Sequence, residues 1–312
     1  MIVYTYITIM SNKNISILFT GQGSQYPTMG LELIEKFDWI KERYQISSDL
    51  LGFDVIKIQS DPNKINLTEF SQPLIFIYSS ILIDLFKEIH KEIIKNNKIY
   101  LAGHSLGEYL ALYFSNTLNF EEMLKLVALR GKAMSKVSNP DKYGMYAILT
   151  KTKIDAKIFT DKVYLANINS INQVVICGEK KNLEDFKLDN PIGKYIPLKV
   201  SAPFHSPIMK ESSEIFLEKA KIFSFKKSNY DLLSNHKLTN YKNIELEDYA
   251  NQLSKQILST VEWTDIINYF ISKEVNNFFE IGPKKTLLNF LPKNENIITC
   301  PFCSYEDINN YV

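Results

Sequence analysis

The segment 98–116 constrains the fold more than any other part of the chain. It is KIYLAGHSLGEYLALYFSN, in which a short β-type apolar run (99–102) precedes GHSLG (103–107) and a helical run follows. G-x-S-x-G between a strand and a helix is typical of a nucleophile elbow, a sharp turn that exposes a serine hydroxyl at the top of a sheet. The glycines leave room for the turn, and the helix N-terminus directs N–H groups at an anion. The pattern predicts that Ser105 is a nucleophile; the alternative is a buried strand-to-helix turn with an incidental serine.

A second glycine-rich turn follows the first predicted strand. The β-type run ISILFT (15–20) ends in GQGSQ (21–25), where backbone N–H groups become available to a ligand. The spacing is not G-x-G-x-x-G, so it gives little support to dinucleotide binding. A plain strand-to-helix turn remains the alternative. Apolar residues at helical spacing predict a buried helix over 68–90 and a further helix over 120–136.

The pattern changes after Asn139-Pro140. Strands are predicted at 144–150, 163–168, 173–178 and 194–200, with helices at about 153–160 and 180–188. This βαββαβ order is that of a split-βαβ, ferredoxin-like domain. About sixty residues of this kind inside a larger α/β chain indicate a small domain that covers the main body.

Composition and charge exclude several classes of protein. The chain has 36 basic and 35 acidic side chains among 312 residues, without a basic block, so we expect no nucleic-acid partner. Residues 1–14 are apolar but lack a secretory signal pattern and are too short to span a bilayer. We interpret them as an additional strand or tail, with Met10 as an alternative start, and expect no membrane association. The three cysteines fit the reducing cytoplasm, and Cys300-x-x-Cys303 has no second ligand pair, so we expect no metal.

A serine nucleophile needs a base, and the chain offers four histidines. We expect His90 to be solvated at a polar helix end and His104 to line the pocket beside the turn. His205 lies in SAPFHS (201–206), where the small domain returns to the main body, and is the favoured base. His236, in a loop, stays open as an alternative.

Arg130 is unusual because it lies within an apolar helical face. It fits a clamp for a substrate carboxylate, because a guanidinium can bind a carboxylate with two hydrogen bonds. The alternatives are an arginine that extends to the surface and one paired with an internal carboxylate.

Taken together, these motifs resemble the malonyl-CoA:acyl carrier protein transacylase family, which includes the acyltransferases of fatty acid and polyketide synthases. Eight matches occur in the family's order over about 15–291: GQGSQ (21–25), GHSLGEY (103–109), LRG around Arg130, GMYAIL (144–149), ANINSINQVVICG (166–178), VSAPFHS (200–206), QILSTVEW (256–263) and FFEIGP (278–283). The resemblance implies an α/β-hydrolase-like core with a parallel sheet and an inserted ferredoxin-like small domain. We place the core at 1–137 and 207–312 and the small domain at 138–206.

The resemblance also implies a role for each matched residue. Ser105 would accept the acyl group, His205 would be its base, and Arg130 would hold the malonyl carboxylate. The remaining implied residues are the oxyanion-hole N–H groups of Gln22 and Leu106, the carbonyl of Gln256 that orients the histidine, and His104, Phe204 and Asn169 in the pocket. Thr28 and Thr260 depart from the family's usual glycine and proline.

The implied reaction is ping-pong transfer of malonyl from malonyl-CoA to an acyl carrier protein, without a cofactor. Phe204 would favour malonyl over methylmalonyl. Length and the sequence FTGQGSQY suggest a discrete acyltransferase that serves a polyketide synthase in trans. The alternatives are the fatty-acid malonyltransferase, an acyl hydrolase that clears carrier proteins, and an inactive scaffold subunit. The sequence does not fix the carrier, the pathway or the oligomeric state.

Overall fold

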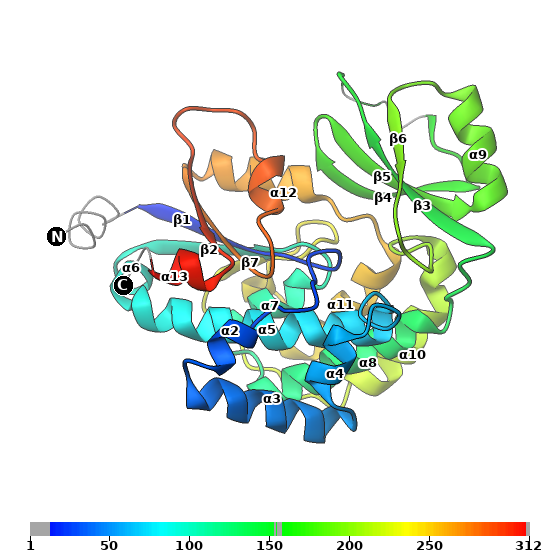
Figure 1. Cartoon of the computed structure of the whole chain (residues 1–312). Helices are drawn as coiled ribbons and strands as arrows, with labels where there is room; N and C mark the ends of the chain where they lie inside the picture. The colour runs from blue at the N-terminus through cyan, green and yellow to red at the C-terminus, as the bar shows by residue number, and fades with distance from the viewer. Residues whose placement is uncertain (1–12, 153, 155–157, 310–312) are drawn as a thin grey trace.

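The computed structural model describes residues 13–152, 154 and 158–309, and these form an α/β body with a smaller α/β domain beside it (Figure 1). The expected leader 1–14 lies outside the described residues except for Lys13 and Asn14, and Asn14 is the first residue of β1.

The main sheet has five parallel strands in the order β7-β2-β1-β8-β9. Their bounds are β1 (Asn14–Phe19), β2 (Lys98–Gly103), β7 (Asp231–Leu233), β8 (Asn277–Ile281) and β9 (Ile298–Phe302). Phe19 pairs with Gly103 on one side and Ile281 on the other, so the three central strands end level with one another. Because the strand order reverses at β1, the loops at this carboxyl edge diverge and leave a crevice, where open α/β sheets bind ligands.

Helices cover both faces of this sheet. They are α2 (Leu31–Ile34), α3 (Asp38–Leu51), α4 (Val55–Ser60), α5 (Thr68–Ile89), α6 (Lys91–Asn96), α7 (Gly107–Phe114), α8 (Phe120–Ser135), α10 (Lys210–Ala220), α11 (Tyr249–Leu258), α12 (Trp263–Ser272) and α13 (Tyr305–Asn309), with 3₁₀ turns η2 (Pro207–Met209), η3 (Tyr241–Asn243), η4 (Leu246–Asp248) and η5 (Leu287–Phe290). Alternate residues of β1 face opposite ways. Ile17 joins the core formed with α5, α7 and α8, whereas Leu18 joins Trp263 and Phe270 of α12.

Helix α5 is the central helix of the larger core. By length and composition it could cross a membrane, but 83% of its most apolar window is buried in the protein, so it is a core helix here. Pro73 lies inside this helix, in its second turn, where a proline removes one hydrogen bond from the helix because it has no N–H group.

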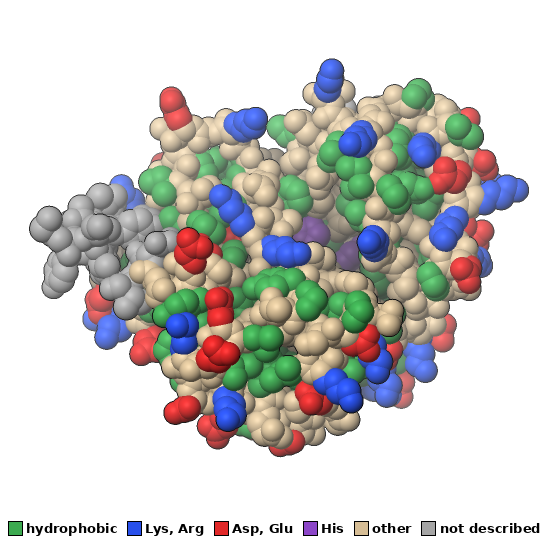
Figure 2. All heavy atoms as spheres, viewed as in Figure 1, with side chains coloured by type: hydrophobic (Ala, Val, Ile, Leu, Met, Phe, Trp, Pro, Cys, Tyr) green, Lys and Arg blue, Asp and Glu red, His purple; other side chains and the backbone are tan. Residues whose placement is uncertain are grey.

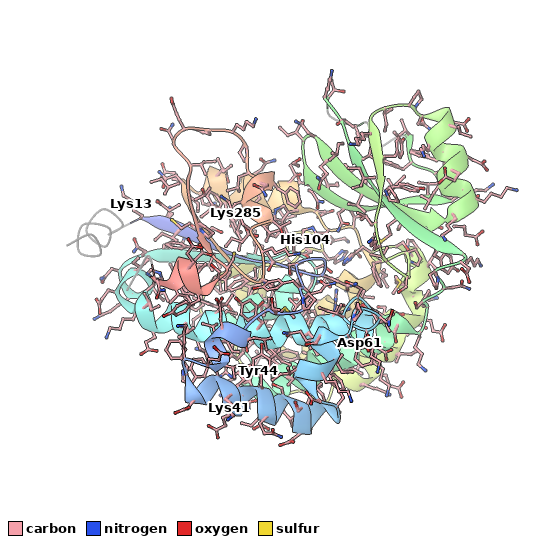
Figure 3. The ribbon with its side chains drawn as sticks, viewed as in Figure 1. Lys13, Lys41, Tyr44, Asp61, His104 and Lys285 are labelled. Atoms are coloured by element: carbon pink, nitrogen blue, oxygen red, sulfur yellow. The ribbon has the colours of Figure 1, made fainter. Side chains whose placement is uncertain are left out.

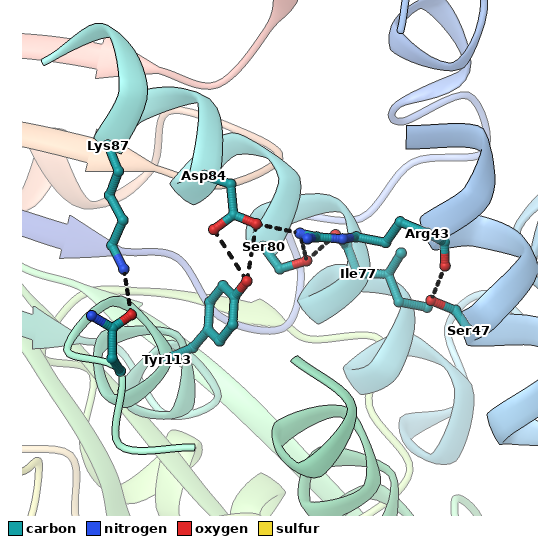
Figure 4. A network of polar contacts seen from close by, with 8 residues as sticks. Arg43, Ser47, Ile77, Ser80, Asp84, Lys87 and Tyr113 are labelled. Carbon is teal, nitrogen blue, oxygen red and sulfur yellow. Dashed lines mark hydrogen bonds and ion pairs between the residues drawn. The ribbon is translucent and has the colours of Figure 1, made fainter. Parts of the chain in front are cut away.

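A polar network ties three helices together below the sheet (Figure 4). Asp84 of α5 accepts a hydrogen bond from Arg43 Nη1 of α3 at 2.6 Å and from Tyr113 Oη of α7 at 3.0 Å. The guanidinium also lies over the Phe120 ring, 4.5 Å from its centroid. The network therefore fixes α3 against α5 and α7.

The small domain has the predicted ferredoxin-like order. Its strands are β3 (Tyr143–Leu149), β4 (Val163–Ser170), β5 (Gln173–Glu179) and β6 (Lys194–Pro197), with helix α9 (Lys180–Asp189). They form an antiparallel sheet in the order β4-β5-β3-β6, with a core of its own that includes Ile176 and Phe186. The expected helix at 153–160 lies largely outside the described residues, and the domain boundaries at 137/138 and 206/207 stay predictions.

The prediction for His90 was wrong. The residue is only 5% exposed and packs against the rings of Phe86, Phe279 and Phe302, with centroids 4.5 to 5.9 Å apart. Burial lowers the pKa of His90 to about 4. The sequence pattern did not predict β9, the strand that supplies Phe302. Without that strand, His90 at the end of α5 was expected to face solvent.

Candidate active site at the carboxyl edge of the parallel sheet

The strand–turn–helix prediction around Ser105 is confirmed. Ser105 has φ +52°, in the left-handed region, between the end of β2 and the start of α7. A Cβ on Gly103 would lie 1.8 Å from the carbonyl of Gly107, and one on Gly107 would lie 2.1 Å from the carbonyl oxygen of Phe19. Both glycines are therefore required for the elbow to close against β1.

Asn235, in the loop after β7, hydrogen-bonds to the backbone of the elbow. Its Oδ1 accepts a hydrogen bond from the Ser105 N–H at 2.6 Å, and its Nδ2 donates to the Gly103 carbonyl at 2.7 Å. Its own N–H donates to Glu108 Oε2 at 2.8 Å. Sequence reasoning missed this residue, because Ser105 and Asn235 are 130 positions apart and nothing in a lone loop asparagine indicates its partner.

The structure brings Ser105 and His205 together. Ser105 Oγ lies 2.7 Å from His205 Nε2, and His205 Nδ1 lies 3.0 Å from the Gln256 carbonyl and 3.2 Å from that of Ser259. Carbonyl oxygens only accept hydrogen bonds, so they place the proton on Nδ1 and leave Nε2 to accept from the serine. Burial, followed by the nearby charge of Arg130, lowers the pKa of His205 to about 3, so the imidazole is neutral at physiological pH.

The other candidate histidines do not reach the serine hydroxyl. His104 Nε2 lies 2.9 Å from Asn169 Oδ1, whose amide nitrogen donates to Gln173, so the ring is fixed within the crevice between the two domains (Figure 3). His104 lines the cavity, as expected. Asn169 is not part of the lining but hydrogen-bonds to His104, and Asn167 lies in the lining where Asn169 was expected. His236 lies beside a separate hollow on the other side of His205.

Arg130 points from α8 into the protein and does not extend to the surface. It is 1% exposed, and its Nη2 donates to Ser105 Oγ at 3.1 Å and to Gln256 Oε1 at 2.9 Å. Its Nη1 donates to Gln72 Oε1 at 2.7 Å. Within residues 13–152, 154 and 158–309, no carboxylate lies within ion-pair distance of the guanidinium. Gln72 is a second residue that sequence reasoning missed.

A cavity of about 490 Å³ opens over these groups. Its lining includes Ser105, His104, His205, Phe204 and Gln22. Figure 2 shows histidine at the bottom of a hollow between the two domains, with Lys or Arg side chains at its rim.

The turns after β1 and β2 touch at the bottom of the cavity. A Cβ on Gly21 would lie 2.3 Å from the His104 carbonyl oxygen, so this glycine permits the close approach. Neither Gln22 N–H nor Leu106 N–H donates a hydrogen bond to another described residue. The Ser105 N–H, in contrast, is already engaged by Asn235. Gln22 lines the same cavity as Ser105, and Leu106 directly follows the serine, so we expect these two N–H groups to be available to an oxyanion.

A metal centre has no support in the described part of the chain, where no group of three or more His, Cys, Asp or Glu could hold an ion. Cys177, Cys300 and Cys303 are buried and lie outside any disulfide.

Comparison with known proteins places this site in a family. Residues 17–293 match the model of the acyl transferase domain. The chain is 32% identical to the polyketide biosynthesis malonyl CoA-acyl carrier protein transacylase PksC of Bacillus subtilis, over 89% of this chain and 96% of that protein. It is 33% identical to the malonyl CoA-acyl carrier protein transacylase of the same species, over 90% of each.

A solved structure agrees with the sequence comparison. The structure of a type II polyketide synthase acyl-carrier protein in complex with its malonyl-transacylase gives a TM-score of 0.85 at 26% identity, over 96% of this chain and 99% of that one. The chain therefore belongs to the malonyl CoA-acyl carrier protein transacylase family of acyl transferases.

Proposed function

We propose that the protein transfers malonyl from malonyl-CoA to the phosphopantetheine thiol of an acyl carrier protein, through a malonyl ester of Ser105. One observation carries the proposal: Ser105 Oγ lies between His205 Nε2 at 2.7 Å and Arg130 Nη2 at 3.1 Å. A base on one side and a fixed cation on the other suit a nucleophile that receives a carboxylated acyl group.

In the first half-reaction, Ser105 Oγ attacks the thioester carbonyl carbon while its proton passes to His205 Nε2. The oxyanion is bound by the N–H groups of Gln22 and Leu106, each worth about 3 kcal/mol in sites of this kind. When the intermediate collapses, the C–S bond breaks and the imidazolium protonates the departing thiolate. His205 ends neutral, and Ser105 carries the malonyl ester.

In the second half-reaction, the carrier thiol gives its proton to His205 and attacks the ester. The serine leaves and regains that proton, so the enzyme returns to its starting state. The carbonyls of Gln256 and Ser259 hold the Nδ1–H throughout and orient the ring. No cofactor is needed, because the proton that leaves Ser105 with coenzyme A is replaced by the proton that the carrier thiol releases.

Arg130 supplies the selectivity for a dicarboxylic acyl group. Its charge is buried without a carboxylate partner among the described residues, so a malonyl carboxylate would meet an unpaired cation, whereas an acetyl group would leave it unpaired. The same feature argues against a general acyl hydrolase, which has no need of a buried cation. Phe204, 7% exposed and lining the cavity, would narrow the space for an α-methyl group.

The entrance to the cavity suits a phosphorylated, acidic partner. Lys199 and Lys284 line it, both are exposed, and none of the described lining residues is acidic. A positive entrance attracts the phosphates of coenzyme A and of the carrier's phosphopantetheine arm. We propose a polyketide synthase carrier protein as the acceptor and the cytoplasm as the compartment.

The test compares two acyl groups and two acceptors. Arg130→Ala should lower kcat/KM for malonyl transfer at least about 100-fold and change acetyl transfer far less, since only malonyl loses an ion pair. Equal losses for both acyl groups would remove the clamp role. Presenting one polyketide carrier protein and one fatty-acid carrier protein to the unaltered enzyme assigns the acceptor, and release of free malonate without transfer would favour the hydrolase.

A further inference from the structure

The partners of the Arg130 guanidinium are all electrically neutral. Its hydrogen bonds go to the amide oxygens of Gln72 and Gln256 and to the hydroxyl of Ser105. A buried arginine is usually paired with a carboxylate, because an unpaired charge away from water is costly. Here the side chains that hydrogen-bond to the cation orient it, and none of them carries a charge.

The structure keeps the buried carboxylate of Glu108 apart from the guanidinium. Gln256 lies between them: its Nε2 donates to Glu108 Oε2 at 3.0 Å, while its Oε1 accepts from Arg130 at 2.9 Å. Glu108 is further engaged by Tyr241 Oη at 2.5 Å and by the Asn235 N–H at 2.8 Å. The Glu108 carboxylate therefore hydrogen-bonds to the groups that support the elbow and not to Arg130.

Gln72 is held with its oxygen toward Arg130. It is fully buried in the first turns of α5, and its Nε2 donates to Thr68 Oγ1 at 2.9 Å and to Met134 Sδ at 3.4 Å. Since the amide nitrogen has these acceptors, the oxygen must face the guanidinium. A carboxylate of the same shape would fit the site and would form an internal ion pair 2.7 Å from Nη1.

We propose that Gln72 determines acyl-group specificity: as a neutral acceptor it fixes the Arg130 guanidinium and leaves the charge of that group to the carboxylate of the incoming acyl group. The inference rests on the proposed function, since it presumes that a malonyl group binds at Arg130. It assigns selectivity to a residue on α5 that acts through Arg130 and is a positioning residue.

The test is the near-isosteric substitution Gln72→Glu, with kcat/KM measured for malonyl and acetyl thioesters under identical conditions. The introduced carboxylate should pair with Arg130, so malonyl transfer should fall at least about 100-fold while acetyl transfer changes by less than about threefold. Asn66→Asp is the charge control, because Asn66 lies in the lining of the cavity over Ser105, whereas the buried Gln72 does not, and it hydrogen-bonds to Gln25 and not to Arg130. It adds the same charge to the cavity and should keep the malonyl-to-acetyl ratio within about threefold.

A second variant separates charge from packing. Gln72→Met removes the acceptor but adds no charge, so the malonyl-to-acetyl ratio should stay within about tenfold of the parent even if KM rises. Thermal unfolding identifies any variant that fails to fold; if Gln72→Glu does not fold, the test is whether Gln72→Met raises the KM for malonyl more than the KM for acetyl, as loss of the group that fixes Arg130 predicts. An unchanged ratio in folded Gln72→Glu, or a complete loss of malonyl preference in Gln72→Met, would overturn the inference. Failure of the unaltered enzyme to transfer malonyl would instead overturn the proposed function.

Discussion

Replacing Asn235 by leucine should weaken both the fold and the reaction. Leucine has a similar branched shape but no hydrogen-bonding atom, so the Ser105 N–H and the Gly103 carbonyl would lose partners at 2.6 and 2.7 Å. Asn235 is 1% exposed, and its substitute would keep water out. Leaving each group buried and unpaired costs about 1–3 kcal/mol, so the loss in unfolding free energy should be about 2–6 kcal/mol.

The functional consequence follows from the position of the elbow. Ser105 has left-handed backbone geometry that Asn235 helps to hold, and a displacement of about 1 Å at a reacting atom can cost about 100-fold in rate. Urea denaturation gives the stability, and the initial rate of malonyl transfer gives the activity. Asn251→Ala is the control, because Asn251 makes only a long, solvent-exposed hydrogen bond to Asp248 at 3.4 Å. Unfolding free energies that agree within about 0.5 kcal/mol for the two variants would refute the reasoning.

Three further predictions concern pH and the glycine contacts of the elbow. The lowered pKa of His205, about 3, keeps the base neutral in acid, so kcat/KM should stay flat from pH 7 to pH 5; a fall centred near the ordinary histidine pKa would contradict this. The same lowered pKa makes the folded protein less stable in acid. Below the unfolded pKa of about 6.5, the unfolded chain binds a proton that native His205 does not bind. The free energy of unfolding should therefore fall by up to about 1.4 kcal/mol per pH unit until the pH nears 3, which thermal unfolding at several pH values would show. Gly107→Ala should destabilise the protein by at least about 2 kcal/mol in urea denaturation, because the added Cβ would lie 2.1 Å from the Phe19 carbonyl oxygen. Gly144→Ala, whose Cβ would meet nothing closer than 3.4 Å, should be tolerated, and similar losses for both would remove the claim of close contact.

The parts of the site that carry a local sequence pattern could be predicted. Ser105 lies in a strand–turn–helix motif that almost defines its own geometry, and the position of His205 at the domain junction by itself favours this residue as the base. The ferredoxin-like strand order followed from alternation of elements along the chain, and the sheet order β4-β5-β3-β6 agrees with it.

The residues that support the site could not be predicted. Gln72, Asn235 and Ser259 act through hydrogen bonds to groups more than 50 positions away. A polar side chain in a loop or a helix does not indicate its partner, which depends on tertiary packing. Strand β7 has only three residues and β9 contains a proline, so neither has a strong strand pattern, and the burial of His90 against β9 was missed for the same reason.

The most direct test of the proposed mechanism is the chemical state of Ser105 during turnover. The protein would be mixed with malonyl-CoA, quenched in acid, digested and analysed by mass spectrometry, with and without a carrier protein. We predict one malonyl group on the peptide that contains Ser105, its disappearance when the carrier thiol is added, and its absence from Ser105→Ala. Normal malonylation of the carrier by Ser105→Ala, with no acyl group on the enzyme, would contradict the proposed mechanism.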